Sequence, residues 1–274
     1  MAENKSKKNP ELSIIITHYK TPHLLLGCLE SIEKKLENID YEVFVSDSEA
    51  NEGTAFLIKY HHPNVKHLAF RKNVGYARLV NEGLKNTKGK FILILNADIV
   101  IENEKSVKAM IEFLDKRKNI GIVGPKLINI DGSTQKSYFK EYTLGSILAR
   151  RTIWKKTHWG KRALEKFELQ KEPKDMPLQV DWLMGSAIMT KKEYIKKVGL
   201  MDERYFMYFE DVDWCRRFRK ASYKIVYLPE AIIRHFHLKQ SDSKRGIIDI
   251  FTNKLTRIHI TSYIRYLWKW HNIK

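Results

Sequence analysis

The stretch Phe91-Ile-Leu-Ile-Leu-Asn-Ala-Asp98 decides the fold class of this chain, because five apolar residues run directly into polar ones. An unbroken apolar run of this length is typical of a strand that is buried on both faces of a sheet. We therefore predict a central strand at residues 91–95, with Asp98 just beyond its carboxyl end.

Short apolar runs and helical patterns alternate around this strand. Further strands are expected at residues 12–17, 41–46, 65–70, 120–123, 224–228 and 231–235, and helices at 21–36, 53–61, 76–86 and 104–117. Thr21-Pro22 fits a helix N-cap followed by the first helical position. This alternation predicts an α/β fold in which helices flank a mostly parallel central sheet.

The composition limits the classes of function. The 274 residues carry 50 Lys and Arg against 32 Asp and Glu, so the formal net charge is +18. We expect an anionic partner, namely nucleic acid, a phosphorylated ligand or a membrane surface. The 43% of hydrophobic residues exclude a wholly disordered chain. No apolar run is long enough to span a membrane, and the polar N-terminus is not typical of a signal peptide.

The cysteine content and the chain organisation indicate one intracellular globular unit. Cys28 and Cys215 lie far apart in the sequence, which argues against a disulfide scaffold and fits a reducing compartment. No linker separates independent domains. The expected parts are a disordered N-terminus at 1–10, a domain at 11–240 with halves at 11–125 and 126–240, and a basic amphipathic helix at 241–274.

Two basic segments are candidates for membrane contact. The insert at residues 134–174 has 11 Lys and Arg against 4 Glu, with Trp154 and Trp159. From Lys239 to the C-terminus there are eight Lys and Arg and two Asp among apolar and aromatic residues that include Tyr266 and Trp270. This composition is typical of a helix that lies in a lipid headgroup layer. The alternative is a tail helix that packs on the domain and exposes a solvated basic face.

Ligands of open α/β sheets bind beyond the carboxyl ends of the strands. The residues at those ends suit a nucleotide and its phosphates: Thr17, Tyr19, Asp47, Arg71, Asn73, Gly75, Asn96 and Asp98. Neither a GxGxxG nor a P-loop motif is present, so we expect a divalent metal, Mg²⁺ or Mn²⁺, to help hold the phosphate. Asp98 is the first candidate ligand, because carboxylate oxygens suit these ions. The alternative is that Asp98 caps a turn or helix.

A second group of acidic residues follows an aromatic run. Tyr205-Phe-Met-Tyr-Phe-Glu210-Asp211-Val-Asp213 places three carboxylates within four residues at the start of an expected helix. A carboxylate among aromatic side chains is a candidate general base, although an ordinary capped helix explains the same charges. His235 ends a short apolar run, and it is a candidate metal ligand if it converges with Asp98.

These motifs, in this order, resemble family 2 glycosyltransferases of the GT-A fold, and most closely bacterial rhamnosyltransferase-like enzymes of cell-surface polysaccharide synthesis. The resemblance covers residues 12 to about 240. It is carried by the segments 13–19, 44–54, 73–81, 95–98, 181–187 and 210–213, and by His235. Asn96 stands where the commoner metal motif has Asp, a form that is common in rhamnosyltransferase-like members.

The resemblance implies an inverting enzyme that moves a sugar, with rhamnose favoured, from a dTDP- or UDP-sugar to a hydroxyl of a lipid-linked or polysaccharide acceptor. It implies that Asp211, next to Glu210, is the catalytic base and that Asp98 and His235 bind the metal. It further implies nucleotide-sugar contacts from the other residues at the strand ends, Thr17, Tyr19, Asp47, Arg71, Asn73, Gly75 and Asn96. Acceptor contacts are expected from Trp182, Gly185 and Asp213.

Two other classes of function remain as alternatives. A basic nucleic-acid-binding protein would explain the charge and the segment 134–174, but the charge is spread over the chain and no RNA- or DNA-binding motif is present, so no nucleic-acid partner is expected. An inactive scaffold subunit with the GT-A fold would explain Asn96. The expected location is the cytoplasm, peripheral on the inner face of the cell membrane.

Overall fold

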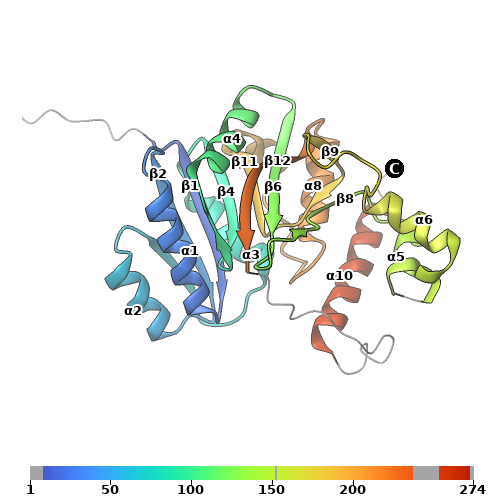
Figure 1. Ribbon diagram of the computed structural model, residues 1–274. Coiled ribbons are helices and arrows are strands. Elements are labelled where there is room, and N and C mark those ends of the chain that lie inside the picture. Colours follow the sequence, from blue (N-terminus) through green and yellow to red (C-terminus); the bar gives the residue numbers. More distant parts are fainter. Residues whose placement is uncertain (1–8, 152, 237–252, 272–274) are drawn as a thin grey trace, which may run out of the picture.

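The computed structural model describes residues 9–151, 153–236 and 253–271 (Figure 1). The strands are β1 (Leu12–Tyr19), β2 (Tyr41–Ser48), β3 (Lys66–Phe70), β4 (Phe91–Asn96), β5 (Ile99–Val100), β6 (Ile120–Ile128), β7 (Thr134–Gln135), β8 (Tyr138–Phe139), β9 (Leu178–Val180), β10 (Trp182–Leu183), β11 (Ala187–Lys191) and β12 (Lys224–His235). The helices are α1 (Pro22–Lys35), α2 (Glu52–His61), α3 (Tyr76–Asn86), α4 (Glu104–Asp115), α5 (Leu144–Arg151), the 3₁₀ helix η1 (Ile153–Lys156), α6 (His158–Phe167), α7 (Lys192–Val198), α8 (Glu210–Lys220) and α10 (Lys254–His271).

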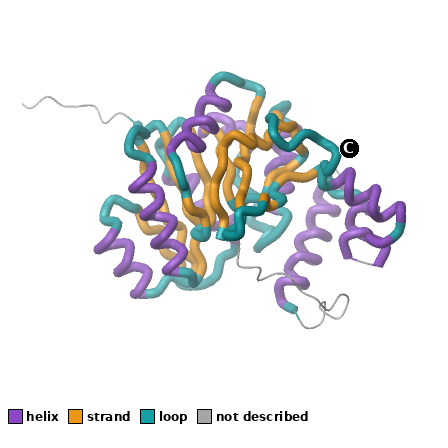
Figure 2. The backbone as a smooth tube through the Cα atoms, viewed as in Figure 1, coloured by secondary structure: helices purple, strands orange, loops and turns teal. Residues whose placement is uncertain are grey.

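One ten-stranded sheet joins the two halves of the chain (Figure 2). Its order is β3-β2-β1-β4-β11-β6-β12-β5, with β7 paired to β6 and β9 paired to β12. The strands from β3 to β4 are parallel, and β11 is antiparallel to both β4 and β6. The predicted α/β class, with a mostly parallel central sheet flanked by helices, is confirmed.

Successive residues of the central strands point to opposite faces of the sheet, as the pleat requires. On one face, Ile14 and Ile16 of β1 belong to a core that also holds residues of α1 and α4. On the other face, Ile15 belongs to a core with α3, α8 and α10. Burial on both faces explains why these strands read as continuous apolar runs.

Two strands in the second half run longer than the sequence predicts. β6 continues from Ile120 to Ile128 through Gly124-Pro125, where we expected it to end. β12 is one strand, although the sequence predicts two, at 224–228 and 231–235. A register shift between Leu228 and Ile232 accommodates Pro229, which has no N–H to donate to the ladder.

The C-terminal helix is present as α10, and it packs on the domain. Tyr266 and Trp270, which the sequence places at a membrane interface, are buried to 2% and 7% exposure and belong to the core of α8. The expectation for these two residues is therefore corrected. The N-terminus at 1–10 was predicted to be disordered, and residues 1–8 of it lie outside the described part of the chain. Residues 237–252 and 272–274 near the C-terminus also lie outside it.

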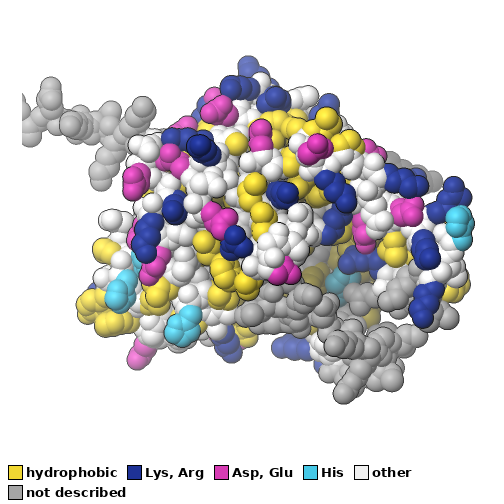
Figure 3. All heavy atoms as spheres, in the orientation of Figure 1, with side chains coloured by type: hydrophobic (Ala, Val, Ile, Leu, Met, Phe, Trp, Pro, Cys, Tyr) yellow, Lys and Arg dark blue, Asp and Glu magenta, His cyan; other side chains and the backbone are white. Residues whose placement is uncertain are grey.

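No helix within the described ranges is both long and apolar enough to cross a membrane. Figure 3 shows Lys and Arg side chains over much of the visible face, mixed with Asp and Glu. The positive charge is therefore distributed on this face and does not form one block.

Candidate active site

The carboxyl ends of β1, β2 and β4 meet at one edge of the sheet. In the register of these parallel strands, Thr17 lies opposite Ser46 of β2 and Asn96 of β4. The Thr17 hydroxyl donates to Asn96 Oδ1 over 3.1 Å. The backbone N–H of Asn96 donates to the carbonyl of Ser186 over 2.9 Å. Thr17 and Asn96 are therefore brought together as predicted, and Ser186, just before β11, is bonded to the end of β4.

The loop after β3 folds back onto the end of β2. Ser48 Oγ accepts a hydrogen bond from the Val74 amide at 3.1 Å, and Asn73 Oδ1 accepts one from the Gly75 amide at 3.1 Å. Gly75 has φ of 82°, and a Cβ there would lie 2.2 Å from the carbonyl oxygen of Phe206. Only glycine suits this position, which starts α3 at the edge where the strands end. Arg71 is exposed in the same loop.

Asp47 at the end of β2 is held by two histidines. His18 Nδ1 lies 2.7 Å from Oδ1 and His67 Nε2 lies 3.0 Å from Oδ2. Burial raises the pKa of Asp47, but the bonds from both imidazoles outweigh it, so that the pKa lies below its ordinary value. The sequence interpretation missed both histidines as partners: His18 stands near the end of β1, and His67 near the start of β3. Tyr19, at 44% exposure, lies at the end of β1.

Asp98 and His235 converge as the sequence interpretation required of a metal site. His235 Nε2 lies 3.2 Å from Asp98 Oδ1, and the backbone amide of Phe236 donates to the Asp98 carbonyl. On the other side of the ring, Nδ1 lies 2.6 Å from Gln135 Oε1. Gln135 was not identified from the sequence. It lies on the short strand β7 and fixes the orientation of the imidazole, as partners of metal-bound histidines do.

This pair of donors fits a divalent cation. Two ligand atoms bound at right angles with bonds of about 2.1 Å would be about 3 Å apart, close to the observed separation. The parts of the chain that the structure describes contain no group of three or more His, Cys, Asp or Glu that could hold a metal. With Asp98 and His235 as ligands, a divalent cation would also accept the oxygens of a diphosphate, which suits Mg²⁺ or Mn²⁺.

Glu210 and Asp211 begin α8 after two residues of left-handed backbone. Tyr208 and Phe209 have φ of 69° and 68°. Asp211 Oδ2 accepts a hydrogen bond from the Gly185 amide at 3.1 Å, and Oδ1 accepts one from the Val212 amide at 2.8 Å. The predicted candidates Asp211 and Gly185 are therefore in direct contact.

The environment of these two carboxyl groups favours their protonated forms. Burial raises the pKa of Asp211 to about 6, against the opposing effect of the backbone amides. Burial and the neighbouring charge of Asp211 raise the pKa of Glu210. Glu210 Oε2 is buried and has no hydrogen-bond partner among the described residues. A pKa near neutrality suits a group that must accept a proton during a reaction.

Tyr76 connects the two sides of the site. Its amide donates to the Phe206 carbonyl at 2.8 Å, and its hydroxyl donates to the Gly185 carbonyl at 2.5 Å. Gly185 in turn donates to Asp211. The start of α3, on the strand-end side, and the start of α8 are therefore held in one hydrogen-bonded network.

Two predicted acceptor residues lie in packed surroundings. Trp182 is 6% exposed, its ring stacks on Phe139 with centroids 4.5 Å apart, and its N–H donates to the Lys140 carbonyl. Asp213 is fully buried and faces Lys269 and Trp270 of α10. Residues two apart on a helix point about 200° from each other, so Asp213 cannot share the direction of Asp211.

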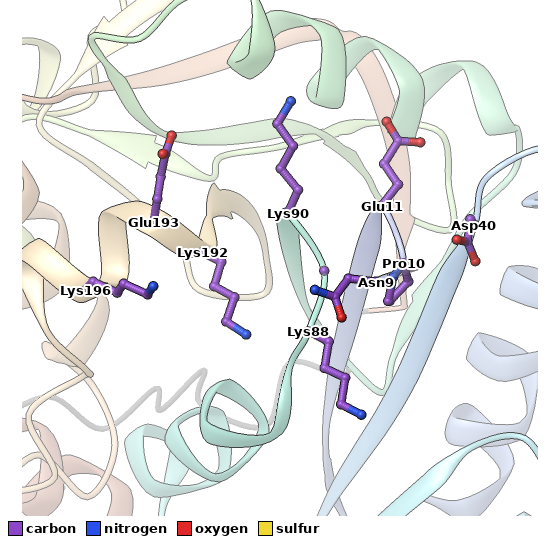
Figure 4. Close-up of a pocket in the computed structure, with 10 residues that line it drawn as sticks. Asn9, Pro10, Glu11, Asp40, Lys88, Lys90, Lys192, Glu193 and Lys196 are labelled. Carbon is purple, nitrogen blue, oxygen red and sulfur yellow. The ribbon is translucent and has the colours of Figure 1, made fainter. Parts of the chain in front are cut away.

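A cavity of about 680 Å³ lies at the other edge of the sheet, near the amino ends of β1 and β4 (Figure 4). Its lining includes Lys88, Lys90, Lys192 and Lys196, with Glu11, Asp40 and Glu193 among them. The side chains of Lys88 and Lys90 point in opposite directions, and Lys90 Nζ is paired with Asp115 at 2.6 Å. This cavity contains none of the predicted site residues.

An α/β sheet whose parallel strands carry polar side chains at their carboxyl ends is the arrangement of the GT-A glycosyltransferase fold. Residues 13–198 match the family model described as "Glycosyl transferase family 2", and the chain belongs to this family. The resemblance found in the sequence, the GT-A fold and the assignment as a glycosyltransferase are confirmed.

Relatives with assigned activities support the same class. The chain is 27% identical over 236 residues to N-acetylglucosaminyl-diphospho-decaprenol L-rhamnosyltransferase of Mycobacterium tuberculosis, a match that covers 81% of this chain and 74% of that protein. It is 23% identical over 220 residues to the low-salt glycan biosynthesis hexosyltransferase Agl10 of Haloferax volcanii, which covers 78% of this chain and 64% of that protein.

Solved structures share the fold at lower identity. The mannosyltransferase PcManGT of Pyrobaculum calidifontis, in complex with GDP-Man and Mn²⁺, superimposes with a TM-score of 0.58 and 16% identity over 86% of this chain. TarS 1–349 of S. aureus superimposes with a TM-score of 0.54 and 17% identity over 82% of this chain. The chain covers 59% and 60% of these two solved chains, respectively.

Proposed function

We propose that this protein is an inverting, metal-assisted glycosyltransferase in which Asp211 is the general base. One observation carries the proposal. The Asp211 carboxylate, whose pKa burial raises to about 6, is tied through Gly185 and Tyr76 to the end of the sheet where the nucleotide-sugar is expected. A base with this pKa is deprotonated in a substantial fraction at neutral pH and can still accept a proton in the transition state.

The donor binds at the ends of β1, β2 and β4 in this proposal. Asp98 and His235 would hold the divalent cation, and Gln135 would orient the imidazole. When bound there, the cation supplies charge neutralisation for the diphosphate leaving group. Thr17, Asn73, Gly75 and Asn96 line the same edge, and exposed Arg71 supports the phosphates.

The transfer is a single displacement. The acceptor oxygen attacks the anomeric carbon from the face opposite the nucleoside diphosphate, a new C–O bond forms, and the bond to the diphosphate breaks. The nucleoside diphosphate leaves with the bonding electron pair, while Asp211 takes the proton of the acceptor hydroxyl. Because one displacement occurs, the configuration at the anomeric carbon inverts. Burial and the charge of Asp211 raise the pKa of Glu210, which favours the protonated form of Glu210 beside the base.

The substrate classes come from the relatives. The name of the mycobacterial relative specifies rhamnosyl transfer to a decaprenol-linked acceptor, and the hexosyltransferase relative acts in glycan biosynthesis. We propose a dTDP- or UDP-sugar as donor, with rhamnose first, and a lipid-linked saccharide as acceptor. This role belongs to the synthesis of a cell-envelope polysaccharide.

A lipid-linked acceptor requires an approach to the membrane, proposed to be its cytoplasmic leaflet. Ile264, Leu267 and Trp268 of α10 are exposed to 59%, 43% and 68%, and Trp154 and Trp159 of the insert are about half exposed. Exposed apolar and aromatic side chains beside basic residues support peripheral binding to anionic lipid. We expect the variant Ile264→Ser/Trp268→Ser to float less with anionic liposomes at low salt than wild type. Equal flotation would remove α10 from this role.

The proposal as a whole is tested by screening the purified protein against nucleotide-sugars with Mn²⁺ or Mg²⁺ and measuring released nucleoside diphosphate. We expect release from one or a few donors, and its loss in excess EDTA. An oligonucleotide-binding arm serves as the control for the basic charge. Absence of release from every donor, together with tight oligonucleotide binding, would contradict the proposal.

A further inference from the structure

Strained backbone leads into the start of α8. Phe209 occupies the N-cap position with left-handed φ and ψ and makes no side-chain capping bond. Tyr208 before it is also left-handed. Such conformations are unfavourable for residues with a Cβ, and they persist only where surrounding contacts impose them. The contacts that impose this geometry therefore also determine where Asp211 stands.

Most of those contacts come from α10, which lies more than 40 residues further along the chain, and the ring of Tyr142 also contacts Phe209. Ser262 Oγ donates to the Met207 carbonyl at 2.8 Å, and Ser262 is 1% exposed. The imidazole of His259 lies 5.0 Å from the Tyr208 ring and 5.3 Å from the Phe209 ring, centroid to centroid. The rings of Tyr263 and Tyr266 also contact Phe209.

A second group of contacts fixes α10 to the first turn of α8. Lys269 Nζ lies 2.7 Å from Asp213 Oδ1 and 2.8 Å from Asp202 Oδ2, and the Trp270 N–H donates to Asp213 at 2.9 Å. Asp213 is fully buried and also pairs with Arg217 on its own helix. The segment from Met207 to Asp213 is thus held at both ends by one helix.

We propose that α10 positions the catalytic base, with Ser262 and His259 as positioning residues that hold Tyr208 and Phe209 in the left-handed conformation. The inference rests on the proposed function only in naming Asp211 as the base. The contacts of α10 with residues 207–213, which we call the clamp, are a property of the fold. They assign the inner face of α10 to the reaction, separately from any contact of its outer face with lipid.

The two neighbouring hydroxyl residues of α10 provide a matched pair of variants. Ser262→Ala removes the bond to Met207, whereas Thr261→Ala removes an exposed hydroxyl that bonds only to the carbonyl of Arg257 in its own helix. His259→Leu is a second variant, which removes the imidazole from the Tyr208 and Phe209 rings. Ser262→Thr retains the hydroxyl and is the conservative variant for rescue.

Hydrogen exchange of the full-length protein, followed for the peptide that covers residues 205–213, reads the clamp without any need for activity. We expect Ser262→Ala and His259→Leu to increase exchange in this peptide by about 3- to 10-fold, the effect of removing one hydrogen bond from a local opening equilibrium. Exchange in residues 91–98 should not change, and Thr261→Ala should match wild type. Unchanged exchange at 205–213 in both variants would overturn the clamp.

Kinetics test the link to the base. We expect kcat of Ser262→Ala to fall by about 3- to 10-fold with the donor KM unchanged, with a shifted acid limb in the pH profile of kcat and recovery in Ser262→Thr. A general loss of stability would not shift that limb. Faster exchange with an unchanged kcat and pH profile would overturn the positioning role. If wild type transfers no sugar, the proposed function fails, while the exchange measurement still decides the clamp.

Discussion

The donor side and the catalytic side of the candidate site are built in different ways. On the donor side, Thr17, Asn96 and Asp98 stand at or just beyond the ends of strands, where backbone pairing fixes them. On the catalytic side, Asp211 follows a strained backbone, and Met207 and Asp213 on either side of it bond to residues 55 and 57 positions away. The pairing of the strands therefore places the donor-side residues, whereas the position of the base depends on packing with residues far along the chain.

The charges differ in the same sense. The donor-side carboxylate Asp47 is paired with two histidines, which lower its pKa despite burial. Among the described residues, Asp211 accepts hydrogen bonds from backbone amides, and burial raises its pKa to about 6. The donor side therefore keeps its charge at low free-energy cost, whereas the catalytic side keeps a carboxylate that would be more stable in water. Such a cost is expected where a group must change its protonation state.

The largest effect is expected on the donor side. Asp98→Ala should reduce nucleoside diphosphate release by at least about 10³-fold, because the diphosphate loses its charge neutralisation. The fold should persist, since Asp98 lies in a turn at the end of the sheet. Turnover assays with circular dichroism as the fold control check this. Full activity of the variant, or of wild type in excess EDTA, would mean that the donor side does not use this carboxylate.

A smaller effect is expected for the residues behind Asp98. His235→Ala should weaken Mn²⁺ binding, measured by calorimetry in the presence of nucleoside diphosphate, and Gln135→Ala should weaken it by about 10- to 100-fold, the range for partners of a metal-bound histidine. The matched control is His62→Ala, because His62 is also buried and pairs with Glu33 far from these residues. Equal Mn²⁺ affinity in all three variants would exclude the pair.

The junction of the two sides is expected to be sensitive to one methyl group. Gly75→Ala should lower the free energy of unfolding by about 2–4 kcal/mol, because the new Cβ is strained at positive φ and meets the Phe206 carbonyl. Gly132→Ala is the matched control, since Gly132 has φ of 81° and nothing within 4 Å of its Cβ position. Denaturant unfolding measures both. If the two variants lose the same stability, the contact with Phe206 contributes nothing.

The smallest effect is expected on the pH dependence of stability, and it arises from Asp211 on the catalytic side. The pKa of Asp211 rises from 3.8 to about 6 on folding, so its protonated form favours the folded state below pH 4, and that contribution is lost as the pH rises through 6. Asp211→Asn should therefore be more stable than wild type at pH 8 by about 1–3 kcal/mol, with no difference below pH 4. Thermal unfolding at both pH values checks this. A variant that is less stable at pH 8 would show that the ionised carboxylate is well accommodated.

Much of the donor half could be predicted from the sequence. Strand ends are local features, and the apolar runs that precede Thr17 and Asn96 locate them directly. The convergence of Asp98 with His235 across 137 positions came from the family resemblance, because no local pattern indicates it. The two histidine partners of Asp47 and the contact of Gln135 with His235 were not predicted, since strand register decides them.

The catalytic half was predicted less well. The carboxylate cluster and the start of its helix could be recognised, and α8 begins at Glu210. The contacts of Asp213 could not be recognised from the sequence. Three neighbouring carboxylates do not reveal that one of them faces Lys269 and Trp270. Likewise, the amphipathic pattern of the tail fits a membrane helix and a packed helix equally. Tyr266 and Trp270 pack inward because α8 offers a buried carboxylate and an arginine to their polar atoms.

In the proposed mechanism, Asp211 accepts the proton of the acceptor hydroxyl, while the donor binds at the ends of β1, β2 and β4. The most direct measurement compares turnover and donor affinity in Asp211→Asn and Glu210→Gln. We expect Asp211→Asn to lose about 10²- to 10⁴-fold in kcat, the range for general base catalysis, with the Kd of the nucleotide-sugar unchanged. An active Asp211→Asn together with an inactive Glu210→Gln would contradict the account.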